Sequence, residues 1–286
     1  MIELPEAYVL AEQINNTLVN KTIISACANA HPHTFAWFTG DPKEYNDKLF
    51  GRKITSANPG TQYTCVGNTE IICTDPAGDK TDMLLTISTP IRYHAVGEKL
   101  PKHHQLLLEI EDHSHLSCTV QMWGSMFCYL ASENGLPDGY TCNKAPSALS
   151  NTFDESYFNM LLAGVKPSLS VKAFLATEQR IPGLGNGVLQ DILFYAGINP
   201  KTKLEKLSDD IKERLYKSVK TTLADMVRRG GRDTEKDLFG HEGGYKTVLS
   251  KKTVHSPCPI CDATIVREAY LGGNIYYCPI CQAYEK

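Results

Sequence analysis

The sequence lacks a long apolar run: in its 286 residues no stretch approaches the roughly 18 residues needed to cross a bilayer. Its beginning, MIELPEAYVL, carries acidic residues where a secretory signal peptide would carry basic ones. We therefore expect a cytoplasmic protein without a membrane segment. Internal repeats and low-complexity tracts are also absent.

A strong net charge is absent as well. The net charge of the whole chain is −3, which by itself argues neither for nor against a nucleic-acid partner. Residues 201–286 hold 16 Lys and Arg against 12 Asp and Glu, a net charge of +4, whereas residues 1–200 hold 13 against 20, a net charge of −7. Phosphate contacts are therefore favoured toward the C-terminal end. The acidic first part argues against strong nonspecific affinity for DNA.

The length suits about two domains plus a small module, and 42% hydrophobic residues suffice for buried cores. Residues 5–19 predict an amphipathic helix, because apolar side chains share one face. These side chains are Ala7, Leu10, Ile14 and Leu18. Residues 22–130 predict a sandwich or barrel, because short β-rich runs alternate with turn residues. The runs are residues 64–66, 70–74, 83–87, 105–110 and 118–122.

A change of pattern follows. Residues 135–150 contain two prolines and two glycines and predict an interdomain linker. Beyond it the apolar period is helical. The predicted helices are residues 154–163, 171–177, 187–196 and 209–229. In the last helix Ser208 is the candidate N-cap, and we expect a packing helix with a solvated basic face.

Four cysteines near the C-terminus have the spacing of a zinc ribbon: Cys258-x2-Cys261, sixteen residues, then Cys278-x2-Cys281. Each Cys-x-x-Cys pair can place two thiolates on one tetrahedral Zn²⁺ ion, and residues 272–274 predict the turn of a hairpin between the pairs. The alternative, two redox or disulfide pairs, is disfavoured by the doubled spacing. With four protein ligands the zinc would be structural.

The other cysteines and the histidines carry weaker signals. Six cysteines lack metal spacing and are expected to be reduced core thiols. They are Cys27, Cys65, Cys73, Cys118, Cys128 and Cys142. The nine histidines lack a complementary carboxylate cluster, so we predict no metal site from them.

A glycine-rich turn, Ile181-Pro-Gly-Leu-Gly-Asn-Gly187, lies between two predicted helices. Glycines at alternate positions let backbone N–H groups approach an anion, and the next helix N-terminus adds its dipole. The spacing differs from the dinucleotide fingerprint G-x-G-x-x-G, and a helix precedes it. A phosphate site and a tight turn without a ligand remain equal alternatives.

Three separate segments of the chain form a recognisable combination of motifs. They are Glu3-Leu-Pro-Glu6, the turn Gly183-Leu-Gly-Asn186 with the following Leu193-Phe-Tyr-Ala-Gly-Ile-Asn-Pro200, and the paired Cys-Pro-Ile-Cys knuckles. In this order and over the whole chain they resemble the formamidopyrimidine-DNA glycosylase and endonuclease VIII family. The resemblance implies base-excision repair, in which a damaged base is flipped out and its glycosidic bond cleaved, after which the abasic strand is nicked.

The resemblance also implies an architecture. The expected fold class is α+β multidomain, with an N-terminal β-sandwich and flanking helices in residues 1–135 and a linker in residues 136–150. A helix-two-turns-helix DNA-binding domain would follow in residues 151–240, and a zinc-ribbon finger in residues 241–286. Damaged or abasic double-stranded DNA would bind in the cleft between the parts. The family default is a monomer, here associated with the nucleoid.

This sequence departs from the family at the catalytic nucleophile. In the family the nucleophile is a proline amine at position 2, freed by removal of the initiator methionine, which attacks the sugar C1′ and forms a Schiff base. This sequence has Ile2, whose branched side chain should block methionine removal. The secondary amine is therefore expected to be absent, and strand cleavage by elimination weak or lost.

The DNA contacts that the resemblance implies also differ. Gln62 stands where the family has a lysine in a β-hairpin, and Asn274 where it has a phosphate-binding arginine. In Thr119-Val-Gln-Met-Trp-Gly124, Gln121 would replace an arginine and Trp123 an aromatic wedge that fills the gap left by the flipped base. A buried core tryptophan is the alternative for Trp123.

Several candidate residues remain. Glu3 and Glu6 are the catalytic candidates, since a carboxylate can activate water against C1′, and the alternative is that they stabilise a helix start. Asn186 is a candidate DNA contact. Lys172 is either a phosphate contact or a surface lysine, and Tyr245 either lines the path of the flipped base or belongs to a glycine-rich connector.

Two functions are therefore compared. The first is a DNA glycosylase with diverged, hydrolytic chemistry centred on Glu3. The second is a catalytically inactive protein that binds abasic or distorted DNA. Retention of Glu3 within an intact Glu-Leu-Pro-Glu segment favours the enzyme. The sequence does not name the lesion, because base identity is read by pocket shape and a few loop contacts.

Overall fold

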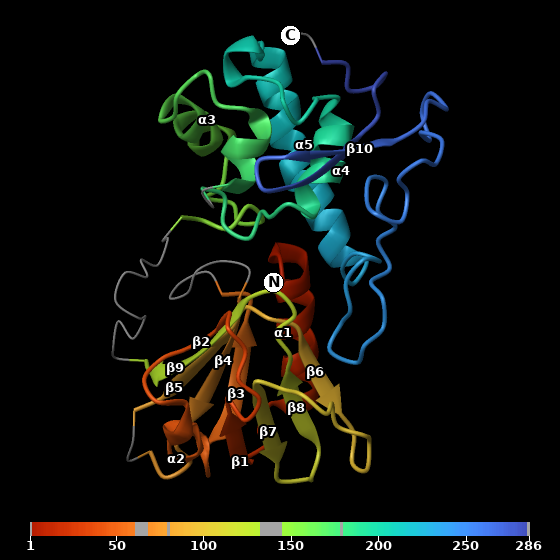
Figure 1. The fold of residues 1–286 in the computed structure, drawn as a ribbon. Coiled ribbons are helices and arrows are strands. Elements are labelled where there is room, and N and C mark those ends of the chain that lie inside the picture. The colour runs from red at the N-terminus through yellow and green to blue at the C-terminus, as the bar shows by residue number, and fades with distance from the viewer. Residues whose placement is uncertain (1, 61–67, 79–80, 132–144, 178–179, 285–286) are drawn as a thin grey trace. The chain divides into compact units, whose positions relative to one another are not determined.

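The computed structural model describes residues 2–60, 68–78, 81–131, 145–177 and 180–284. The chain divides into two compact units (Figure 1). The first unit contains residues 1–144 and 236–242, and the second contains residues 145–235 and 243–286. The second unit thus holds both the predicted helical region and the four-cysteine region.

The first unit is built mainly from strands. Its helices are α1 (Leu4–Leu18), the 3-10 turn η1 (Pro42–Glu44) and α2 (Tyr45–Leu49). Its described strands are β1 (Ile23–Ala28), β2 (Ala36–Phe38), β3 (Lys53–Asn58), β4 (Thr69–Thr74), β5 (Met83–Ile87), β6 (Ile91–His94), β7 (Leu106–Ile110), β8 (His115–Cys118) and β9 (Gly124–Leu130).

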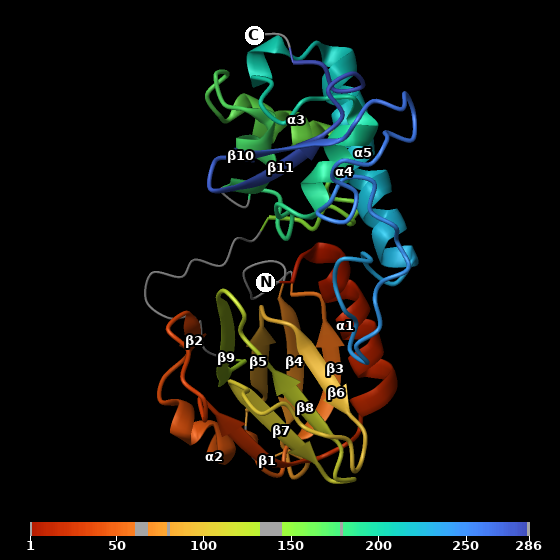
Figure 2. The same ribbon diagram turned by 45° about the vertical axis from the view of Figure 1, so that its right-hand side comes forward.

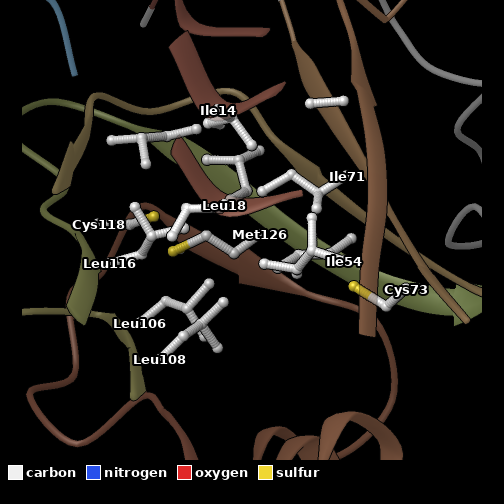
Figure 3. Close-up of a cluster of buried hydrophobic side chains, with 14 of the residues drawn as sticks. Ile14, Leu18, Ile54, Ile71, Cys73, Leu106, Leu108, Leu116, Cys118 and Met126 are labelled. Carbon is white, nitrogen blue, oxygen red and sulfur yellow. The ribbon is translucent and has the colours of Figure 1, made fainter. Parts of the chain in front are cut away.

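These strands form two sheets that face each other as a sandwich (Figure 2). Within the described residues one sheet has the order β1-β7-β8-β6 and the other the order β2-β9-β5-β4-β3, in which only the β2–β9 pair is parallel. Both sheets send apolar side chains into one core, which Figure 3 shows. Leu106, Leu108 and Leu116 come from the first sheet and Ile54, Ile71 and Met126 from the second. The predicted β-sandwich is confirmed.

Helix α1 begins where its sequence predicts. Pro5 lies in its first turn, where a missing N–H costs no hydrogen bond, and Glu3 is the N-cap residue. The four side chains predicted to share a face are all buried in the sandwich core. Asn15 fixes the helix to β3, since its side chain accepts a hydrogen bond from Ala57 N at 2.7 Å and donates to Ala57 O at 2.8 Å.

A second piece of the first unit comes from far along the chain. In residues 236–242, Leu238 is fully buried in the sandwich core. Its carbonyl accepts a hydrogen bond from Tyr93 N at 2.8 Å, and its N–H donates to Gln13 Oε1 at 2.9 Å. The segment is therefore held by both α1 and β6.

The second unit is helical with one small sheet. Its helical segments are α3 (Glu155–Ala163), the π-helical η2 (Ala173–Thr177), α4 (Val188–Ala196), the 3-10 turn η3 (Leu204–Lys206) and α5 (Asp209–Arg228). The hairpin strands are β10 (Val266–Tyr270) and β11 (Gly273–Tyr277). All four predicted helices are confirmed, with the second in π-helical form, and Ser208 caps α5 by accepting a hydrogen bond from Ile211 N.

Some predicted elements differ from the structure. The strand predicted at residues 118–122 is wrong, because β8 ends at Cys118 and β9 begins at Gly124. Between them Val120 N donates to the Gln105 side chain at 2.7 Å and Thr119 O accepts from Thr89 Oγ1 at 3.0 Å, so side chains satisfy the backbone that a strand would pair. The strand predicted at residues 64–66 lies outside the described residues.

Two smaller predictions also need correction. The hairpin in the cysteine-rich end is confirmed, but its turn is Leu271-Gly272, both with positive φ, whereas residues 273 and 274 belong to β11. Of the predicted core thiols, Cys73, Cys118 and Cys128 are buried, but Cys27 is exposed. Cys65 and Cys142 lie outside the described residues.

In the part of the chain that the structure describes, no helix has the length and apolar character that a membrane crossing requires.

Candidate functional site

The N-terminal segment is joined to the central strands of the second sheet. The Ile2 N–H donates a hydrogen bond to the Ser88 carbonyl at 3.1 Å, and the Ile2 side chain is buried in the sandwich core. Ser88, just after β5, is in turn bonded to Ser125 in β9 through backbone and side chain. Position 2 is therefore fixed at the end of β5 and β9.

Glu3 and Glu6 lie at the start of α1. Glu3 is half-buried at the N-cap position, and its side chain does not cap the helix N–H groups. Glu6, in the first turn, is buried. A negatively charged side chain at this end of a helix interacts favourably with the helix dipole. Both carboxylates therefore lie at the N-terminal end of α1.

The loop of residues 119–123 lies at the same end of the sandwich and leads directly into β9 at Gly124. Gly124 N donates to the Phe35 carbonyl at 2.9 Å, which fixes the loop's second end. A Cβ on Gly124 would lie 2.8 Å from the Thr89 Cβ, so glycine allows this close approach. Trp123 is 38% exposed, which contradicts the alternative of a buried core tryptophan.

The predicted glycine-rich turn is confirmed in the second unit. Gly183 has φ +68°, the left-handed conformation that glycine adopts without strain, and Leu184 N donates to the Ile181 carbonyl. Helix α4 follows, starting after Gly187. Asn186 is exposed at the end of the turn.

Two predicted residues meet at the hairpin. The Asn186 side chain donates a hydrogen bond to the Asn274 carbonyl at 2.9 Å, and Gln190 donates to the same carbonyl at 3.2 Å. The Asn274 side chain accepts from Arg267 Nε at 3.0 Å across the hairpin. The glycine-rich turn and the hairpin therefore form one polar surface.

Lys172 is buried, so it is not a surface lysine. Its ammonium donates hydrogen bonds to the carbonyls of Tyr270 and Leu271, at the hairpin turn. Burial lowers the pKa of Lys172 from its ordinary value. The lysine holds the hairpin turn against the segment that begins η2.

Tyr245 is also buried in the second unit, where its ring contacts the Arg229 guanidinium at 5.8 Å. Its hydroxyl faces Asp191 of α4, and burial raises the pKa of Tyr245. Asp191 accepts hydrogen bonds from Val248 N at 2.9 Å and Leu249 N at 2.8 Å. This network fixes the chain that leads to the cysteines.

The four predicted cysteines meet. Their sulfur atoms all lie within 4.8 Å of one another, with 3.8 Å between Cys258 and Cys281 and 3.4 Å between Cys261 and Cys278. In a tetrahedral site with Zn–S bonds of about 2.3 Å the sulfurs are about 3.8 Å apart, so the cluster fits Zn²⁺. Burial opposes ionisation of Cys258, but the N–H groups of Ile260 and Cys261 lower the pKa of its thiol.

Gln62 lies outside the described residues. Several residues that the sequence reasoning missed take part in the sites, namely Ser88, Ser125, Gln190 and Arg267. Their types are common on any surface or strand, so no local pattern distinguishes them. Trp37 was missed too, although its ring meets that of Trp123 at 5.8 Å and the chain has only two tryptophans.

Comparisons with known proteins agree with this architecture. Residues 145–237 match the family model described as the formamidopyrimidine-DNA glycosylase H2TH domain. The chain is 26% identical to a formamidopyrimidine-DNA glycosylase of Lactobacillus delbrueckii subsp. bulgaricus over 297 residues, and 25% identical to that of Bacillus cereus over 291 residues. Each match covers 99% of both chains.

Solved structures show the same fold. The MutM (Fpg) protein of Thermus thermophilus superposes with a TM-score of 0.79 at 18% identity, covering 99% of this chain and 100% of the other. The Lactococcus lactis Fpg in complex with DNA containing an abasic site gives the same TM-score at 21% identity and the same coverage.

In order along the chain, the protein has an N-terminal β-sandwich, a helix-two-turns-helix domain and a C-terminal four-cysteine cluster. Residues 145–237 carry the H2TH domain of formamidopyrimidine-DNA glycosylases, and the chain is similar to these glycosylases over its whole length in sequence and in fold. The resemblance read from the sequence is thereby confirmed.

Proposed function

We propose that this protein is a DNA glycosylase that removes damaged bases from double-stranded DNA after flipping them out of the stack. The observation that carries the proposal is the whole-length match to relatives named formamidopyrimidine-DNA glycosylase, with Glu3 retained at the start of α1. Solved relatives bound to DNA with an abasic site support the same substrate class. A repair function would place the protein at the nucleoid, in the cytoplasm, and we expect a monomer.

The chemistry follows from position 2. With Met1 retained, as the branched side chain of Ile2 predicts, the nitrogen of position 2 is a peptide amide that donates to the Ser88 carbonyl and is not a free amine. We therefore infer hydrolysis in place of Schiff-base formation. The Glu3 carboxylate takes a proton from water as the water oxygen bonds to C1′. The electron pair of the breaking C1′–N bond leaves with the base nitrogen, which takes up a proton from solvent, and Glu3 returns its own proton to solvent. Glu6 supports the site from the first turn of the helix.

DNA would be held by residues of both units. The proposed contacts are Gln62 and Trp123 in the first unit and Asn186 and Asn274 in the second. Lys172 and Tyr245 are buried inside the second unit, so they support the hairpin turn and the chain before the cysteines and do not contact DNA. The polar surface formed by Asn186 and Asn274 lies next to the start of α4, and the dipole of a helix N-terminus favours a phosphate. Since Gln62 and Asn274 replace cations of the family pattern, we expect weaker phosphate affinity and a weaker dependence on salt.

The test compares Glu3→Gln with wild type. Duplexes carrying an oxidised purine, an oxidised pyrimidine or an alkylated base are incubated with the full-length protein, and free base is quantified. Loss of the proton acceptor should lower base release by about 10²- to 10⁴-fold. Glu12→Gln is the matched control, since Glu12 is exposed on the same helix, and it should release base like wild type.

The second candidate function has a distinct outcome. A catalytically inactive binding protein would release no base from any lesion, would still prefer abasic or distorted DNA, and would bind as tightly or more tightly with Glu3→Gln. That result would overturn the enzymatic proposal while keeping the DNA partner.

We further propose that Cys258, Cys261, Cys278 and Cys281 hold one structural Zn²⁺ ion. Their sulfur separations, and the absence of a fifth ligand among the described metal-binding groups, support a closed site. The purified protein should contain one zinc per chain by elemental analysis. Cys261→Ser should lose most of it and melt at a lower temperature, while Cys27→Ser, at an exposed cysteine, should change neither. A metal-free wild type with unchanged stability would contradict the zinc site.

A further inference from the structure

An exposed aromatic surface lies beside the loop of residues 119–123. It combines residues from two places in the chain, Phe35 and Trp37 at β2 and Met122 and Trp123 in the loop. Met122 is 74% exposed, Phe35 53%, and each tryptophan 38%. Large apolar side chains gathered on a surface in this way mark a binding site more often than chance exposure.

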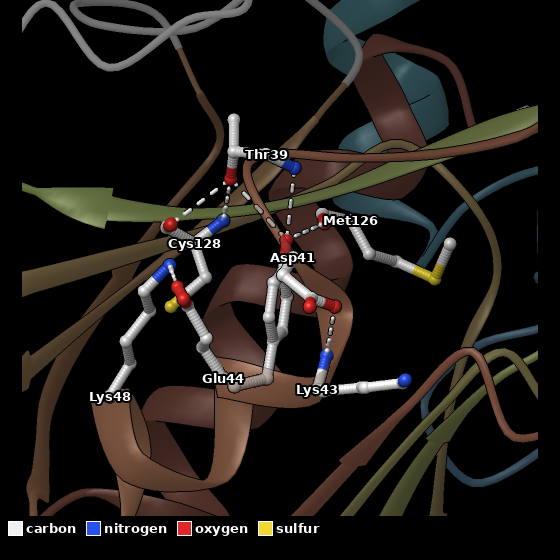
Figure 4. A network of polar contacts seen from close by, with 8 residues as sticks. Thr39, Asp41, Lys43, Glu44, Lys48, Met126 and Cys128 are labelled. Atoms are coloured by element: carbon white, nitrogen blue, oxygen red, sulfur yellow. Dashed lines mark hydrogen bonds and ion pairs between the residues drawn. The ribbon is translucent and has the colours of Figure 1, made fainter.

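The surface is rigidly held from below. Trp37 pairs with Ser125 in the parallel β2–β9 register. Just after β2, the Thr39 hydroxyl donates to the Cys128 carbonyl at 3.0 Å and accepts from Cys128 N at 2.8 Å (Figure 4). The Tyr45 hydroxyl donates to the Met126 carbonyl at 2.7 Å. Both anchors tie the backbone of β2 to β9, so the exposure of the rings on β2 is not a consequence of fraying.

The loop side is equally fixed, by the bonds of Thr119, Val120 and Gly124 already described. A fixed array of exposed rings loses little conformational entropy when a flat ligand stacks on it, which favours binding. The two tryptophan rings meet edge to face, leaving other ring faces toward solvent.

The chemistry of the surroundings points to nucleic acid. None of the six residues that line the hollow carries a carboxylate, and His33 and Gln121 supply its polar groups. Beside it, Gln105 links the loop at Val120 to the carbonyl of His31. The His31 ring contacts those of His103 and His104 at 5.0 and 4.9 Å. Exposed aromatic faces without carboxylates and with polar groups at their edge suit stacked bases.

We propose that Phe35, Trp37, Met122 and Trp123 form a base-stacking surface for unpaired nucleotides. The preferred substrate is then DNA whose bases next to the damaged position are unpaired, as in a bubble or a single-stranded junction, and not a regular duplex. This inference rests on the proposed function for its DNA partner. It adds a second aromatic group, on β2, to the single wedge expected at Trp123.

The chain's only two tryptophans both lie in this surface, so fluorescence excited selectively at tryptophan reports on it. The full-length protein is titrated with a duplex containing an abasic site and with the same duplex carrying a bubble beside that site. We expect stronger quenching and tighter binding with the bubble. Labelled DNA followed by anisotropy gives the affinity independently.

Single substitutions test whether the residues of this surface cause the tighter binding to the bubble. Trp37→Ala should weaken binding to the bubble about tenfold, as expected for the loss of one stacked base, with little change for the regular duplex. Met122→Ala should act in the same direction, and its high exposure protects against a folding defect. Phe50→Ala is the control, because Phe50 is 61% exposed elsewhere in the same unit. Thermal melting checks that each variant is folded.

Other outcomes would overturn the proposal. Equal affinity of wild type and both surface variants for the bubble would do so while leaving the glycosylase proposal intact. A fluorescence shift with phosphatidylcholine vesicles, or on concentrating the protein alone, without a response to DNA would assign the surface to a membrane or to a second copy. Failure to bind any of the DNAs by anisotropy would instead contradict the proposed function itself.

Discussion

Position 2 combines a structural and a chemical role. The Ile2 side chain belongs to the sandwich core, and its N–H is bonded to Ser88, so the residue that replaces a reactive proline contributes to packing. The sequence alone predicted the loss of the amine, because it depends only on residue type. It did not predict Ser88 or Ser125, which reach Ile2 only through the pairing of β5 and β9.

Asp191 makes a pH-dependent contribution to stability. Burial raises the pKa of Asp191 to about 6, although Val248 N and Leu249 N donate to its carboxylate and Arg232 lies nearby. A carboxyl group whose pKa is higher in the folded state binds an extra proton on folding between about pH 4 and about pH 6. Its contribution to the free energy of unfolding therefore falls as the pH rises through that window.

The measurement is urea unfolding of wild type and Asp191→Asn at about pH 4.5 and about pH 7. The amide does not titrate, so wild type should lose stability relative to the variant on going to the higher pH. Release of zinc in acid affects both proteins and cancels in the difference. A difference that is the same at both values would show that Asp191 keeps an ordinary pKa.

Helices and strands with a strong apolar periodicity could be predicted from the sequence. Helices α1, α4 and α5 and strand β5 follow from their apolar patterns because each buries one face or the whole segment. The same criterion gave the wrong strand at residues 118–122, because Cys118, Val120 and Met122 alternate with polar residues as in a strand. Only the structure shows that side chains of Thr89 and Gln105 take the backbone hydrogen bonds.

The same loop supplies a stability prediction. Gly124→Ala should destabilise the first unit by about 1–3 kcal/mol, because its Cβ would meet the Thr89 side chain at 2.8 Å and force β9 or the loop to shift. Gly164→Ala is the control, since its Cβ would make only ordinary contacts of 3.5 Å or more and its φ is negative. Denaturant unfolding of both variants checks this, and an unchanged midpoint for Gly124→Ala would refute the close packing.

At the scale of the whole molecule, the assignment of chain segments to the two units cannot be predicted from local sequence patterns. Residues 236–242 pack in the first unit, although their neighbours on both sides belong to the second. Nothing in this short segment predicts its partner, because Leu238 would suit any core, and its place depends on Gln13 and Tyr93 more than a hundred residues earlier. The three-part order of the fold, by contrast, was readable from motifs.

The candidate sites divide in the same way. The cysteine cluster was predictable because two short spacings contain all of its ligands. The meeting of Asn186 with Asn274 was not, since those residues are 88 positions apart and the contact is made through a backbone carbonyl. The alternative of a surface lysine for Lys172 was wrong, because one residue type serves both buried and surface roles.

The central claim is that base removal proceeds without a Schiff base at the N-terminus. It is tested most directly with end-labelled duplexes carrying the lesions, incubated with wild type and Glu3→Gln and analysed for strand breaks before and after hot alkali. We predict breaks only after alkali, and none with Glu3→Gln. Breaks without alkali, together with a covalent complex trapped by borohydride, would contradict the account, because a terminal or lysine amine would then be attacking C1′.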